Sequence, residues 1–306
     1  NHLPPVAYNM LGLIFGIAVS ALVIWFVRRW MNEKKLIAKQ TLKGGDVTYN
    51  DVKDVPSIFT VALRVILHGT LKSEGKLLPG AEKKDIATNI VIKTAKIEEN
   101  NLRAYNKICE VSSDKLTVPV CYLDVLWFRT IPQLVTRRDW PISPMALIHI
   151  KQEHIYYRAI KPTDKLNLKM RFSTGDIEKG EKGYIITITQ DAFVGKEKVW
   201  DSTMKLLSRY PKKTKGPRKK HEKPDVSSFK QSTIAVAKDV STKYATISGD
   251  YNLQHLPYIC NLVGYKRPIV HGLWAMQRCF AQLQKDIGTG FPDFPYKFTT
   301  EFKMPI

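Results

Sequence analysis

The stretch that decides the fold runs from residue 244 to residue 272 and reads YATISGDYNLQHLPYICNLVGYKRPIVHG. Ser248, Gly249 and Asp250 are expected to turn the chain, and His255 follows five residues after Asp250 in a stretch too irregular for a helix. A loop of this kind can bring a carboxylate and an imidazole into one small volume, where they can handle the protons of a single water molecule. The sequence therefore predicts that Asp250 and His255 form an acid–base pair.

A helix is predicted directly after this stretch. Apolar residues at positions 273, 276, 280 and 283 recur at spacings of three and four, and Gly288 is a typical stop signal. The first turn of this helix then falls at Gly272. Free backbone amides at a helix amino terminus bind negative charge, and a residue without a side chain lets a ligand approach closely. Gly272 is accordingly predicted to stabilise an oxyanion.

Each of these residues also has an ordinary structural explanation: Asp250 as a helix cap, His255 as a surface residue and Gly272 as a packing point. Their combination is more specific. GDxN, a histidine at a fixed distance and PIVHG before a helix together resemble the signature of the MaoC-like dehydratases, also called hydratase 2, a branch of the hot-dog superfamily. That family's pattern is close to YAxxSGDxNPxHxDPxxAxxxGFxxPIxHG.

The resemblance implies an α+β double hot-dog fold, in which antiparallel sheets wrap around central helices. It also implies a hydro-lyase, a (3R)-hydroxyacyl thioester dehydratase or, in reverse, a trans-2-enoyl-CoA hydratase. By the match Asp250 and His255 are the catalytic pair, Asn252 orders the site and Gly272 is the oxyanion donor. Such an enzyme needs no metal or redox cofactor. Its substrate is a fatty acyl thioester of coenzyme A or acyl carrier protein, and family members can form homodimers.

Two positions depart from the family pattern. Leu253 stands where proline is usual, and Leu256-Pro257 lacks the aspartate expected there, which shortens the interval between His255 and His271 by one residue. Neither change removes a proton-transfer group. The alternative hypothesis is a non-catalytic hot-dog scaffold that binds acyl thioesters or a partner protein at a membrane.

Residues 10–27, MLGLIFGIAVSALVIWFV, contain no charged side chain and as a helix are long enough to cross the hydrocarbon core of a bilayer. A buried core helix or a signal peptide would be the alternatives. A soluble helix normally has a polar face, however, and a signal peptide carries its positive charge before the apolar run. Here the basic residues follow the run, beginning at Arg28. We predict a single-pass membrane protein with its catalytic domain on the cytoplasmic side.

The remaining chain is expected to form two hot-dog halves. An antiparallel meander of four strands is predicted between residues 145 and 209, and the apolar segment 118–135 is predicted to be a helix, or a cover for the acyl chain, broken by Pro132. The predicted divisions are an anchor with its flank (1–33), a spacer (34–54), a first, non-catalytic half (55–208), a basic linker (209–228) and a second, catalytic half that is cut short at its carboxyl end (229–306).

The 48 basic and 28 acidic side chains give a net charge of +20. Residues 209–223 hold eight basic residues against one acid, which suits a solvated linker, with attraction to anionic lipid or to nucleic acid as the alternatives. Only Tyr210 is available there to stack on a base, so no nucleic-acid partner is predicted.

Metal and nucleotide chemistry have little support in the sequence. The four cysteines form no CxxC pair, and His149 and His154, five residues apart in a predicted strand, are expected to point to opposite faces. No metal site is therefore predicted. The chain also contains neither a GxxxxGK[ST] loop nor a GxSxG elbow.

Overall fold

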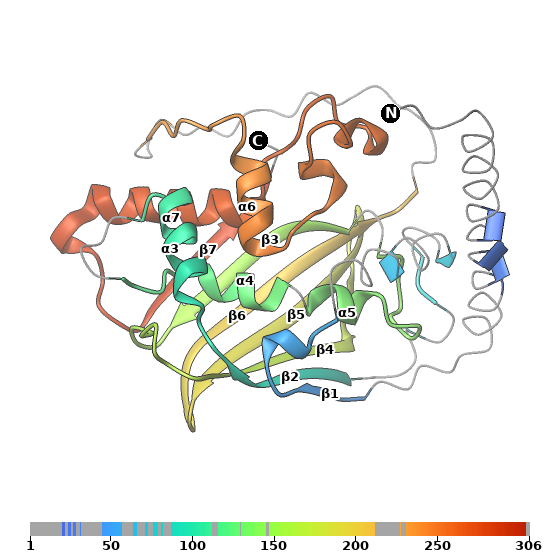
Figure 1. Ribbon diagram of the computed structural model, residues 1–306, viewed down its shortest axis with the longest axis horizontal. Helices are drawn as coiled ribbons and strands as arrows, with labels where there is room; N and C mark the ends of the chain where they lie inside the picture. The colour runs from blue at the N-terminus through green and yellow to red at the C-terminus, as the bar shows by residue number, and fades with distance from the viewer. Residues whose placement is uncertain are drawn as a thin grey trace, which may run out of the picture.

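The computed structural model describes residues 45–56, 87–111, 116–128, 130–144, 147–211 and 231–303, with isolated residues before and between these ranges. Over this part of the chain a seven-stranded sheet lies against a group of helices, which are gathered on one side of it (Figure 1). The buried core fills the space between the sheet and these helices, and it includes the fully buried Trp127 and Trp200.

The strands follow one another in the sheet in the order β1-β2-β4-β5-β6-β3-β7. β1 runs parallel to β2, and every other neighbouring pair is antiparallel. The strands are β1 (Val47–Tyr49), β2 (Ala87–Ala95), β3 (Leu147–Tyr156), β4 (Leu166–Lys179), β5 (Gly183–Val194), β6 (Glu197–Arg209) and β7 (Tyr296–Glu301).

The four strands predicted between residues 145 and 209 are present, but they do not form a simple meander. β4, β5 and β6 are joined as successive hairpins, whereas β3 pairs with β6 and not with β4. The alternation of apolar and polar residues fixes which face of a strand is buried, but not which strand lies beside it. The connection 157–165 is longer than a tight hairpin loop, so it leaves β3 free to reach the far side of β6.

The prediction that His149 and His154 point to opposite faces is wrong. Between His149 and Lys151 the pairing of β3 with β6 shifts by one residue, so that Ile150 is a bulge. A bulge reverses the alternation of side chains, and both histidines therefore face the core. Burial lowers the pKa of His149 to about 4.

Within the apolar segment 118–135, residues 122–128 and 131–135 are helical, which agrees with the prediction of a helix, but Pro132 lies inside the second helix and does not break it. Pro132 lies in the first turn of the second helix, where a missing N–H costs no hydrogen bond. The helices are α3 (Glu99–Ile108), α4 (Tyr122–Phe128), α5 (Ile131–Val135), α6 (Val240–Ser248) and α7 (Gly272–Ile287), with short 3-10 turns at Val52–Asp54, Leu253–His255, Cys260–Val263 and Gly288–Gly290.

Three of the predicted segments are the spacer, the membrane helix and the basic linker. β1 lies inside the predicted spacer and pairs with β2, so the sheet begins before residue 55. The predicted membrane helix at 10–27 and the basic linker at 209–228 fall largely outside the described residues. Within the part of the chain that the structure describes, no helix combines the length and the apolar character needed to span a bilayer.

Candidate active site

The site begins where α6 ends. Gly249 has a φ of 76°, a left-handed conformation that glycine adopts without steric cost, and the chain turns there as predicted. The next backbone N–H, that of Asp250, donates to Ser248 Oγ at 3.1 Å. Asp250 is consequently held in the interior, with only 8% of its surface exposed.

Three side chains meet at this point. Asp250 Oδ2 lies 4.0 Å from His255 Nε2 and 3.9 Å from His271 Nε2, and the two imidazole rings stack with their centroids 3.8 Å apart. His255 is 6% exposed and His271 is 1% exposed. The structure therefore brings the two residues of the predicted acid–base pair together in a small, nearly dry volume.

The hydrogen bonds of the two rings indicate which nitrogens carry protons. His255 Nδ1 lies 2.8 Å from the carbonyl oxygen of Ile269, and His271 Nε2 lies 2.9 Å from that of Asp250. Because a carbonyl only accepts, each of these nitrogens is the donor. In neutral His255 the Nε2 atom is then an unprotonated base, 4.0 Å from the Asp250 carboxylate. That gap is too long for a direct hydrogen bond but suits a water molecule between the two groups.

Burial affects the protonation of two of these groups. It raises the pKa of Asp250, against the opposing influence of His255 and of hydrogen bonds from Asn252. Burial, together with the neighbouring His255, lowers the pKa of His271 to about 3. His271 is thus a neutral ring at physiological pH, whereas the surroundings of Asp250 favour the protonated form of its carboxyl group.

The other two predicted site residues border this cluster. The backbone N–H of Asn252 donates to Asp250 Oδ1 at 3.2 Å, and the residue itself is exposed. Gly272 is the first residue of α7, so its N–H belongs to the turn whose amides have no acceptor within the helix. A Cβ atom at Gly272 would lie 3.0 Å from the ring of Phe302. The close approach of this ring gives Gly272 a role in packing, and its role as an oxyanion donor stays a prediction.

His271 was missed as a site residue, although it stands in the quoted PIVHG motif. Its stacking on His255 and its bond to the backbone of Asp250 link the two ends of the loop. The signal in the sequence was a histidine directly before a helix start. Nothing in the spacing indicated that its ring would turn back toward Asp250.

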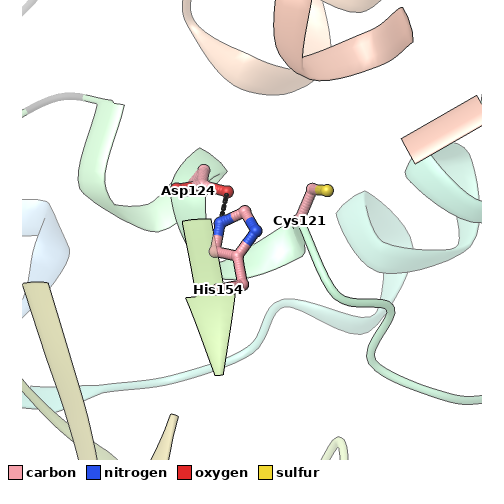
Figure 2. Close-up of side chains that lie close together, drawn as sticks. All are labelled: Cys121, Asp124 and His154. Carbon is pink, nitrogen blue, oxygen red and sulfur yellow. Dashed lines mark hydrogen bonds and ion pairs between the residues drawn. The ribbon is translucent and has the colours of Figure 1, made fainter. Parts of the chain in front are cut away.

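A second buried polar cluster lies in the first half. Figure 2 shows three side chains that lie close together: Asp124 on α4, Cys121 just before α4, and His154 on β3. His154 Nε2 lies 2.8 Å from Asp124 Oδ2. Gln152 adds a contact of 2.5 Å to Ser202 Oγ. Asp124 is 1% exposed and His154 fully buried. Sequence reasoning missed this pair, although a lone acid within the apolar VPVCYLDVLWF run was its signal.

Among the residues that the structure describes, two sets of side chains bring potential metal-ligand atoms within 4.8 Å of one another: Cys121, Asp124 and His154, and Asp250, His255 and His271. In the second set each histidine already has one nitrogen bonded to a backbone carbonyl. In the first set burial raises the pKa of the Cys121 thiol, which disfavours the thiolate that a metal binds. A site without a metal remains our prediction.

Comparison with known proteins shows which solved structures are similar to this chain. No protein-family model matches the chain. The crystal structure of HtdX of Mycobacterium tuberculosis superimposes with a TM-score of 0.57 at 21% identity, over 71% of this chain and 83% of that one. A MaoC-like dehydratase from Phytophthora capsici superimposes with a TM-score of 0.52 at 20% identity, over 72% and 81% of the two chains. The chain thus has the double hot-dog fold of the MaoC-like dehydratases, as expected.

A curated relative is also similar to the chain in sequence. The 3-hydroxyacyl-thioester dehydratase X of Mycobacterium tuberculosis is 24% identical over 248 residues, which cover 78% of this chain and 84% of the relative. The relatives are named as dehydratases, which is consistent with a hydro-lyase.

Proposed function

We propose that this protein is a (3R)-hydroxyacyl thioester dehydratase, equivalently a trans-2-enoyl-CoA hydratase, that uses Asp250 and His255 as its acid–base pair. The observation that carries the proposal is the approach of the buried Asp250 carboxyl group to the His255 imidazole, across a gap of 4.0 Å. The dehydratase name of the curated relative supports it.

The proposed reaction follows from this geometry. In the hydration direction a water molecule lies between Asp250 and His255 and attacks the β carbon of the enoyl thioester. The pair takes one proton from the attacking water and passes that proton on to the α carbon, so that both groups regain their starting state when the hydroxyl group has bonded to the β carbon. Negative charge develops on the thioester oxygen during the attack. The N–H of Gly272, in the first turn of α7, is positioned to stabilise it.

His271 and Asn252 hold this pair in place. His271 bonds to the backbone oxygen of Asp250 and stacks on His255, while the Asn252 N–H holds one oxygen of the Asp250 carboxylate. We expect these contacts to keep the second carboxylate oxygen directed toward His255.

The substrate is proposed to be a fatty acyl thioester, carried by coenzyme A or acyl carrier protein, and handled without a metal or redox cofactor. We further propose that residues 10–27 anchor the enzyme in a membrane with its catalytic domain on the cytoplasmic side, on the uncharged length of that segment alone.

The test is hydration of trans-2-enoyl-CoA, followed by the loss of enoyl-thioester absorbance. Asp250→Asn is expected to lower kcat/KM by about 10²- to 10⁴-fold, because the carboxylate takes part in proton transfer. His255→Ala should be similarly impaired. Full activity in Asp250→Asn would contradict the assignment. No turnover by folded wild-type protein would favour a non-catalytic acyl-thioester-binding scaffold.

A further inference from the structure

The segment between α6 and α7 carries an exposed apolar surface. The side chain of Tyr258 is 95% exposed and that of Leu262 is 78% exposed. In Figure 1 this segment lies at the top of the molecule, on the side of the helices away from the sheet. Three further large apolar residues exposed on it are Tyr251, Leu253 and Ile259. Apolar side chains concentrated on a surface in this way mark an interaction site. We call this segment, residues 251–267, the outer loop.

The backbone of the outer loop holds these side chains outward. Tyr258 has a φ of 68°, a left-handed conformation that costs energy in any residue with a Cβ atom. Hydrogen bonds on either side maintain it, from Cys260 N–H to the Leu256 oxygen and from Tyr265 N–H to the Cys260 oxygen, both 3.1 Å long. The strained residue gains almost no packing within the chain. We therefore expect contacts with a ligand outside the chain to offset the energetic cost of this backbone conformation.

The charge of this region selects the kind of ligand. Residues 251–285 contain no aspartate or glutamate, and Lys266 and Arg267 are exposed at the end of the outer loop. Tyrosine and leucine side chains flanked by basic residues are typical of protein segments that lie in the interface of an anionic membrane. An acidic carrier protein would be held chiefly by ion pairs, whereas here five exposed apolar side chains accompany two basic ones.

We propose that the outer loop is a lipid-binding surface, with Tyr258 and Leu262 inserted among the head groups of an anionic bilayer and Lys266 and Arg267 against its phosphates. His255 is part of the same loop and Asp250 directly precedes it. Docking would therefore place the catalytic pair beside the bilayer, where long-chain acyl thioesters gather. This last step rests on the proposed hydratase function; the lipid contact itself does not.

The test measures the environment of the outer loop itself, because a membrane anchor elsewhere in the full chain would also bind vesicles. Cys279 is exposed, and the other three cysteines are buried. An environment-sensitive fluorophore is attached to Leu262→Cys in a Cys279→Ser background. The matched control carries it on Leu283→Cys, since Leu283 is 41% exposed on α7. The full chain is then mixed with phosphatidylcholine vesicles, with and without phosphatidylserine.

We expect a blue shift and a rise in emission at position 262 with phosphatidylserine vesicles, and a smaller response or none at position 283. Replacing Lys266 and Arg267 by glutamate should reduce the shift at 262. Equal responses at the two positions, or none at 262, would overturn the proposal. So would a shift produced by acidic acyl carrier protein and absent with vesicles. If Leu262→Cys does not fold, Tyr258→Cys takes its place.

Hydration of a short, soluble enoyl-CoA without vesicles separates this proposal from the proposed function. We expect Tyr258→Ser and Leu262→Ser to leave that activity unchanged. Loss of hydration in the unmodified protein would count against the catalytic assignment, while the fluorescence result would still decide the lipid contact.

Discussion

His271 contacts both residues of the proposed acid–base pair. Its donor nitrogen fixes the backbone oxygen of Asp250, and its face supports the ring of His255. Since its pKa lies near 3, it adds no positive charge to the site at physiological pH.

We therefore predict that His271→Phe, which keeps a stacking ring but removes the N–H donor, lowers kcat by about 10²-fold through misplacement of the pair. His271→Gln keeps a neutral N–H donor and should recover much of that loss. Both are measured by enoyl-CoA hydration, with circular dichroism as the check on folding. Equal activities in the two variants would show that the donor is not what matters.

Asp250 gives a second prediction, from the sign of its pKa shift. Burial disfavours its charge, so folding raises its pKa above that of the unfolded chain. Below pH 3.8, the pKa of this side chain in the unfolded protein, the protonated form makes its full contribution to stability. This contribution is lost as the pH rises through the higher pKa of the folded protein. Asp250→Asn should thus be more stable than wild type at neutral pH. The difference should shrink on acidification, which urea unfolding at several pH values would measure; a constant difference would contradict it.

At the scale of elements, the contact between α4 and β3 depends on the buried hydrogen bond between Asp124 and His154. His154→Ala would leave the Asp124 carboxylate buried without its partner, since its remaining contact to Gln152 is 3.4 Å long. Breaking a buried pair in this way costs about 3–5 kcal/mol of unfolding free energy. Denaturant unfolding measures the loss. Lys243→Ala, which breaks the exposed pair with Asp239, is the control and should change stability little.

Elements with a local signal could be predicted from the sequence. The spacing along α7, the stop at Gly288 and the turn at Gly249 all correspond to the structure. The neighbour of β3 and the bulge at Ile150 could not be predicted, because both depend on pairing with β6, far along the chain. In the candidate site the local pair of Asp250 and His255 was found, whereas Asp124 and His154 meet only through tertiary packing.

At the scale of the whole molecule, the two halves are joined by one sheet and by buried polar contacts. β7 of the second half pairs with β3 of the first along six residues. On the helical side, the Trp274 indole N–H donates to the Ile108 oxygen at 2.9 Å, and the Asn101 side chain donates to the Ile247 oxygen at 3.0 Å. These contacts bring α3 of the predicted first half against α6 and α7, and α6 leads directly into the candidate site. Residues of the predicted first half therefore support the candidate site.

Gln277 tests this dependence most directly. It is fully buried on α7, and its Oε1 accepts the backbone N–H of Cys121, just before α4, at 3.0 Å. Gln277→Leu fills similar space but leaves that N–H without an acceptor, which costs about 1–3 kcal/mol. If the halves form one cooperative unit, tryptophan fluorescence and hydratase activity should be lost at the same, lower denaturant concentration. Loss of activity well before the fluorescence change would instead show that the second half unfolds by itself.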